Sequence, residues 1–90
     1  MKIEDFITVI NTLEKGVISR GTIIDYLADH NDNWVLILKA LLIKNTTHFV
    51  SKHYLLEKLN FMKNDPGKAH LFLDIQGLNI YNCLKGYYGD

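Results

Sequence analysis

Hydrophobic residues recur at helical spacing through the first third of the chain. Between residues 3 and 13 they form one stripe along a single helix face. The stripe consists of Ile3, Phe6, Ile7, Ile10 and Leu13. Gly16 follows the stripe and is predicted to end the helix in a left-handed conformation. A second, short helix is predicted to begin at Thr22, whose hydroxyl group can cap it.

The middle of the chain predicts a helix that is apolar on nearly every side. From Trp34 to Ile43 the only charged interruption is Lys39. A helix of this kind is typical of the centre of a bundle, where other elements surround it. We therefore expect a central helix over about residues 34–44, beginning at Asp32 or Asn33.

The last part of the chain leaves two readings open. A fourth helix is predicted from about His48 to Met62, and Asp65 followed by Pro66 predicts another helix start. Beyond it, residues 70–81 alternate in part like a strand hairpin, and they also fit one face of a helix. A lone hairpin is marginal beside four helices, so the helix is favoured and the hairpin is the alternative.

Length and composition then define the fold class. A chain of 90 residues, 48% of them hydrophobic, fits one domain and supports a core without disulfides or a structural metal. The sequence is predicted to contain no internal repeat, no low-complexity tract and no linker. The prediction is an all-α fold, a single compact bundle of four to six helices spanning residues 1–90.

Several classes of protein are excluded by what the chain lacks. Its single cysteine, Cys83, forms neither an internal disulfide nor a CxxC pair. Glu4 and Asp5 stand where a secretory signal would be basic. The longest apolar stretch, near residues 34–43, is about half as long as a membrane-spanning helix. The expected location is the cytoplasm, and no membrane association is expected.

No catalytic or metal-binding pattern stands out. His48 and His53 have the spacing of half a zinc finger, without the cysteine half. The acidic and amide cluster at residues 29–33 resembles the opening of a calcium loop, but Trp34 occupies the position that requires glycine. Neither serine lies in a nucleophile elbow. The chain is predicted not to be an enzyme, with no cofactor and no metal.

Charge divides the chain into two halves of opposite sign. Residues 1–33 carry six acidic and three basic side chains, and residues 34–90 carry seven lysines and four acids. Tyrosine among carboxylates is suited to a basic protein surface. The predicted partner-binding residues are Asp25, Tyr26, Asp29, Asp32, Tyr87 and Tyr88.

These features favour a protein that binds and blocks another protein by occlusion. In size, helical pattern and neutral charge the chain resembles small bacterial immunity proteins, antitoxins and phage-encoded inhibitors, which implies a toxin such as a nuclease as the target. The alternative is a DNA- or RNA-associated regulator that contacts phosphates through Lys44, His48 and Lys52, spaced four residues apart. A further alternative is a homo-oligomeric module joined through Phe61 and Met62 or through Tyr87 and Tyr88.

Overall fold

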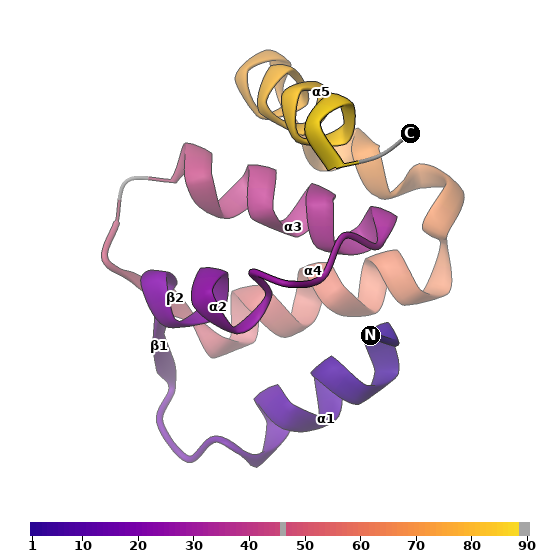
Figure 1. The fold of residues 1–90 in the computed structure, drawn as a ribbon. Coiled ribbons are helices and arrows are strands. Elements are labelled where there is room, and N and C mark those ends of the chain that lie inside the picture. The colour runs from indigo at the N-terminus through magenta and orange to yellow at the C-terminus, as the bar shows by residue number, and fades with distance from the viewer. Residues whose placement is uncertain (46, 89–90) are drawn as a thin grey trace.

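The computed structural model describes residues 1–45 and 47–88, and helices dominate it (Figure 1). Two short strands and one 3-10 helix (η1) accompany them. In chain order the elements are α1 (Ile3–Thr12), β1 (Val17–Ser19), α2 (Arg20–Tyr26), α3 (Asn33–Lys44), β2 (Phe49–Ser51), α4 (Lys52–Asn64), η1 (Pro66–Phe72) and α5 (Ile75–Tyr88).

The all-α prediction is confirmed, and so is the central position of the most apolar helix. Every residue of α3 from Val35 to Leu42 is buried, including Lys39. In Figure 1, α5 lies at one end of the molecule and α1 at the other, with α3 and α4 between them. A helix packed on several sides has no solvated face, which explains the missing polar stripe in α3.

The two strands join segments that are far apart in the sequence. β1 and β2 pair in antiparallel fashion, with Ile18 opposite Val50 at the centre of the register. Just beyond the strands, the amide of Arg20 donates to the carbonyl of His48, and the amide of Lys52 donates to that of Gly16. The chain thus forms a two-stranded sheet that ties the start of α2 to the start of α4.

Both helices that follow the strands have a serine as their N-cap. The hydroxyl oxygen of Ser19 accepts from the amide of Thr22, and that of Ser51 accepts from the amide of Tyr54. A serine at this position satisfies one of the free amides of the first helical turn. Ser19 and Ser51 therefore determine where α2 and α4 start.

Three details of the sequence prediction are wrong. Helix α2 begins at Arg20, before the predicted Thr22, and α4 begins at Lys52 because residues 49–51 pair as a strand. No described glycine, Gly16 included, has a positive φ. At residues 70–81 the favoured helical reading is confirmed and the alternative hairpin is not formed, since that segment contains the end of η1 and half of α5.

The structure also reveals an internal repeat that inspection of the sequence missed. The first unit (α1–β1–α2) and the second unit (α3–β2–α4) match at a constant offset of 32 residues, both at the strands and at the starts of α2 and α4. Residues 17–20 read Val-Ile-Ser-Arg and residues 49–52 read Phe-Val-Ser-Lys. Buried residues match as well: Phe6 with Leu38, Ile10 with Leu42, Ile23 with Leu55, and Leu27 with Leu59.

The two units differ in what covers them. Helix α3 packs most extensively against α5, which follows the second unit. The positions of α1 that match Leu36 and Ala40 of α3 are Glu4 and Thr8, and both are exposed. A helix needs a second apolar face only where another element lies on it. α5 therefore accounts for the difference between an amphipathic α1 and an apolar α3.

Candidate functional site

An apolar groove opens between the two helices of the first unit. It has a volume of about 220 Å³ and almost no polar lining. We call it the α1–α2 groove. Its lining residues are Phe6, Val9, Ile10, Leu13, Ile18, Thr22, Ile23 and Tyr26. Concave apolar surfaces with a few polar groups are the usual form of a binding site.

The groove continues beyond the end of α1. A shallower depression of about 550 Å³ adjoins it and shares Leu13, Ile18 and Thr22 with it. Val17 and Leu13 expose much of their side chains here. Together the two hollows form an apolar surface that runs from α2 to the loop before β1. Exposed apolar surface of this extent is typical of an interaction site.

Tyr26 forms the aromatic edge of the α1–α2 groove. Its ring lies 5.7 Å from the ring of Phe6, which in turn lies 5.6 Å from that of Trp34. Tyr26 is nevertheless 47% exposed. A tyrosine held by a buried aromatic neighbour presents contact area without losing much side-chain freedom on binding. The structure therefore brings the predicted Tyr26 to the groove.

Charged side chains of both signs lie on the elements that form the groove and the adjoining depression. Asp25 lies next to Tyr26 on α2 and is exposed, and Asp5 is exposed on α1. Glu14 and Lys15 line the adjoining depression. The guanidinium of Arg20 donates to the carbonyls of Leu42 and Thr47, and the ammonium of Lys52 reaches the carbonyl of Leu13. Charges of both signs therefore border the two hollows, and the charge next to Tyr26 in the sequence is the acidic Asp25.

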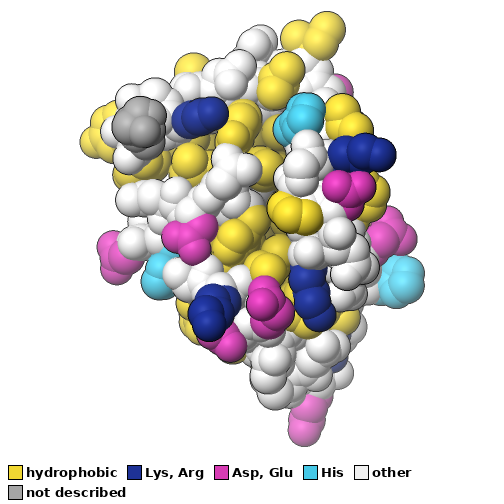
Figure 2. Space-filling model, turned by 90° about the vertical axis from the view of Figure 1, so that its right-hand side faces the viewer, with side chains coloured by type: hydrophobic (Ala, Val, Ile, Leu, Met, Phe, Trp, Pro, Cys, Tyr) yellow, Lys and Arg dark blue, Asp and Glu magenta, His cyan; other side chains and the backbone are white. Residues whose placement is uncertain are grey.

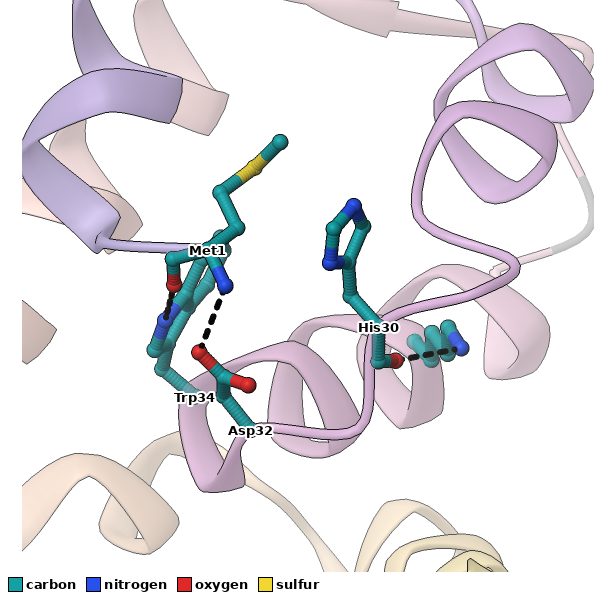
Figure 3. Close-up of polar contacts among 5 residues, drawn as sticks. Met1, His30, Asp32 and Trp34 are labelled. Carbon is teal, nitrogen blue, oxygen red and sulfur yellow. Dashed lines mark hydrogen bonds and ion pairs between the residues drawn. The ribbon is translucent and has the colours of Figure 1, made fainter.

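A buried lysine brings two other predicted site residues together. The ammonium of Lys39 donates to the carbonyl of His30 at 3.0 Å (Figure 3) and lies 5.3 Å from the centre of the Tyr88 ring. Burial lowers the pKa of Lys39, and the nearby Asp29 carboxylate partly opposes this effect. Asp29 and Tyr88 thus surround Lys39, away from the α1–α2 groove.

Asp32 makes a different contact. Its carboxylate accepts from the amino group of Met1 at 3.1 Å, and the indole of Trp34 donates to the carbonyl of Met1 at 3.2 Å (Figure 3). Asp32 precedes α3 as its N-cap, as the sequence predicted, although its side chain does not bond to a helix amide. Its charge is compensated here, so Asp32 contributes less than Asp25 to an acidic binding surface.

The three basic residues of the nucleic-acid alternative lie on three different elements. Lys44 ends α3, His48 lies in the loop before β2 and Lys52 begins α4. The ammonium of Lys44 pairs with Asp74. That of Lys52 donates to the carbonyls of Leu13 at 2.5 Å and Asn11 at 3.3 Å. The spacing of four residues therefore does not produce one basic helix stripe.

The Lys44–Asp74 ion pair leads to a testable prediction about the pKa of Asp74. The bond from Lys44, aided by the amide of Gly77, holds the pKa of Asp74 below its usual value. Stability from this carboxylate is complete above its unfolded pKa and is lost as the pH falls through the lowered folded pKa. We expect Lys44→Met to raise the pKa of Asp74, measured by NMR titration of its carboxyl carbon. Lys68→Met, which leaves Lys44 in place, is the control and is expected to leave the pKa of Asp74 unchanged. An unmoved Asp74 would contradict the pairing.

Helix α5 provides a second exposed surface. Tyr87 is 81% exposed, and Ile75 is exposed to a similar degree. A shallow depression of about 510 Å³ lies on this helix alone, lined by Asn79, Ile80, Cys83, Leu84, Tyr87 and Tyr88. In Figure 2 hydrophobic side chains reach the surface mostly in the upper half, where α5 and η1 lie in Figure 1. Of the other oligomer candidates, Phe61 is partly exposed and Met62 is buried.

The described residues offer neither a cluster of metal ligands nor a membrane-spanning helix. In residues 1–45 and 47–88, no group of three or more histidine, cysteine, aspartate or glutamate side chains is placed to hold a metal ion. Within the described ranges, no helix combines the length and apolar character needed to cross a bilayer.

The sequence predicted Tyr26, which lines this groove, and the neighbouring Asp25, but it did not predict the groove itself. Leu13, Ile18 and Thr22 were not predicted as site residues, since none carries a chemical signature. A position-by-position comparison of the two repeat units would have pointed to Thr22 as a position where the units differ. Tyr54 stands in the second unit where Thr22 stands in the first, and Lys58 stands where Tyr26 stands. The side chains at these matched positions therefore differ in size and shape between the two units.

Known proteins add no further information on this site. Comparisons of the chain with protein-family models, with curated proteins and with solved structures yield no significant match.

Proposed function

We propose that this protein binds another protein through the first unit and blocks it by occlusion, as an inhibitor or immunity-type protein does. The observation that carries the proposal is the half-exposed Tyr26 ring, held by Phe6 at the edge of the apolar α1–α2 groove. An aromatic anchor beside an apolar hollow is typical of the energetic centre of a protein interface.

Charge supports a basic partner. The first 33 residues carry a net charge of −3, and Asp25 lies exposed beside the anchor. Complementary charge around an apolar centre speeds association and favours the correct partner. The target surface that fits this description is a basic one, such as the substrate-binding face of a nuclease.

Charge reversal at Asp25 on α2 and at Asp29, which follows α2, tests this proposal. Asp25→Lys combined with Asp29→Lys is expected to weaken the complex by more than about tenfold, because both side chains would then repel a basic partner. The partner is obtained by pull-down with the tagged protein from nuclease-treated source lysate, and the affinity is then measured by calorimetry with purified components. The matched control is Glu57→Lys with Asp65→Lys, which reverses one charge on α4 and one directly after it.

The same experiment separates the alternatives. Equal loss of affinity in the control variant, or none in the Asp25 and Asp29 variant, would exclude this surface. Captured material that disappears after nuclease treatment, with binding that falls steeply with salt, would favour the nucleic-acid regulator instead. A complex that contains only copies of this chain would favour the homo-oligomeric module.

A further inference from the structure

A separate hollow lies where α1, α3, α4 and η1 meet. It has a volume of about 340 Å³ and shares no lining residue with the α1–α2 groove. We call it the four-element hollow. Its lining residues are Ile3, Glu4, Asn33, Trp34, Met62, Lys63, Pro66 and Ala69. Small-molecule sites have volumes of about 300 to 1,000 Å³, so this hollow has the size of a site for one small molecule.

The buried part of this lining is apolar and firmly held. Met62 and Ala69 are each only 2% exposed. Trp34 packs against the core with its ring 5.6 Å from that of Phe6, and its indole donates to the carbonyl of Met1 (Figure 3). Side chains that are already fixed lose little freedom when a ligand binds. The hollow therefore offers a preformed surface to an apolar group.

Two charges of opposite sign lie on the rim of the hollow. Glu4 belongs to the first turn of α1 and Lys63 to the last turn of α4, and both are exposed. Among the described residues they are the only charged side chains that line the hollow. Neither belongs to an ion pair within the described part of the chain, so the carboxylate and the ammonium do not compensate each other.

The charges next to these lining segments in the sequence are placed differently. Asp32 pairs with the amino group of Met1, and Asp65 pairs with Lys68 at 3.9 Å. Lys2 is exposed but does not line the hollow. The lining itself therefore presents one carboxylate and one ammonium group above an apolar surface.

We infer that the four-element hollow binds a small zwitterion with an apolar body, namely an α-amino acid with an aliphatic side chain. Its ammonium group pairs with Glu4, its carboxylate pairs with Lys63, and its side chain lies against the apolar lining. A ligand that lacks one of the two charges leaves one rim group unmatched and binds more weakly. The inference goes beyond the proposed function and does not depend on it, because the two sites have no lining residue in common.

The hollow contains its own optical probe. Trp34 is the only tryptophan of the chain, so its fluorescence reports on this site. L-Leucine is titrated into the protein, and a dissociation constant of about 0.1 to 1 mM is expected for so small a ligand. Amide NMR shifts locate the bound ligand and are expected at the starts of α1 and α3 and in η1.

Two analogues and two variants test each charge separately. N-acetyl-leucine lacks the ammonium group and leucinamide lacks the carboxylate, and each is expected to bind about fivefold more weakly than leucine. Glu4→Gln is expected to weaken leucine by about the same factor but to leave N-acetyl-leucine unchanged. Lys63→Met is expected to weaken leucine and to leave leucinamide unchanged. The controls are Asp5→Asn and Lys68→Met, at exposed positions outside the lining, and both are expected to bind leucine like the wild type.

The outcomes decide the inference without reference to the partner protein. An unchanged Trp34 signal at ten times the expected dissociation constant would overturn it. So would equal affinity for leucine and both analogues, or an equal loss of affinity in the control variants. Shifts confined to α2 and β1 would place the ligand in the α1–α2 groove and would equally exclude the four-element hollow.

Discussion

Leu38→Ala is expected to lower the free energy of unfolding by about 3 to 4 kcal/mol, measured by urea denaturation. Leu38 is completely buried near the middle of α3. Alanine suits a helix, so the cost comes from lost apolar contacts and from the cavity that remains. A domain of this size has a total stability of about 5 to 15 kcal/mol, so the variant is expected to lose a large part of it.

Ile43→Ala is the matched control for this substitution. Ile43 belongs to the same helix, and its side chain is 43% exposed. Its truncation removes fewer contacts and leaves a site that water can fill, so a loss of about 1 kcal/mol or less is expected. Equal losses for the two variants would mean that α3 is not the buried centre of the fold.

Arg20→Met is expected to cost about 2 to 3 kcal/mol, because it removes two charge-assisted hydrogen bonds between distant segments. The guanidinium donates to the carbonyl of Leu42 at 3.0 Å and to that of Thr47 at 2.9 Å. Leu42 lies in the last turn of α3, where carbonyls have no partner within the helix. Methionine keeps most of the side-chain length but donates nothing, so both carbonyls lose this donor.

The repeat suggests a second variant, and an exposed lysine of the first unit provides a control. Lys52 matches Arg20 in the second unit, and it reaches back to the carbonyls of Asn11 and Leu13 at the end of α1. Arg20→Lys is therefore expected to retain a substantial part of the stability that Arg20→Met loses. Lys15→Met, at an exposed position, is expected to change the stability by less than about 0.5 kcal/mol. An Arg20→Met protein as stable as the wild type would show that these bonds contribute nothing.

The proposed site was only partly accessible to sequence reasoning, for a reason that its residues make clear. Asp25 and Tyr26 attract attention because carboxylates and an aromatic ring are informative by residue type alone. Leu13, Ile18 and Thr22 have no such signature, and their role depends on how α1 and α2 come together around them. For Lys44 and Lys52 the sequence predicted too much. Their regular spacing suggested one shared basic surface, but Lys44 pairs with Asp74 and Lys52 donates to the carbonyl of Leu13.

The sequence alone determined the parts of this protein that depend on local order. Hydrophobic periodicity predicted the helices, and the apolar run interrupted only by Lys39 predicted that α3 is the central one. The counts of charged residues showed that residues 1–33 are the acidic part of the chain. The tertiary structure decided the strand pairing of Ile18 with Val50 and the opening of the α1–α2 groove. Each of these depends on segments that meet only in the folded chain. Periodicity records which face of an element is buried, but it does not record which element buries it.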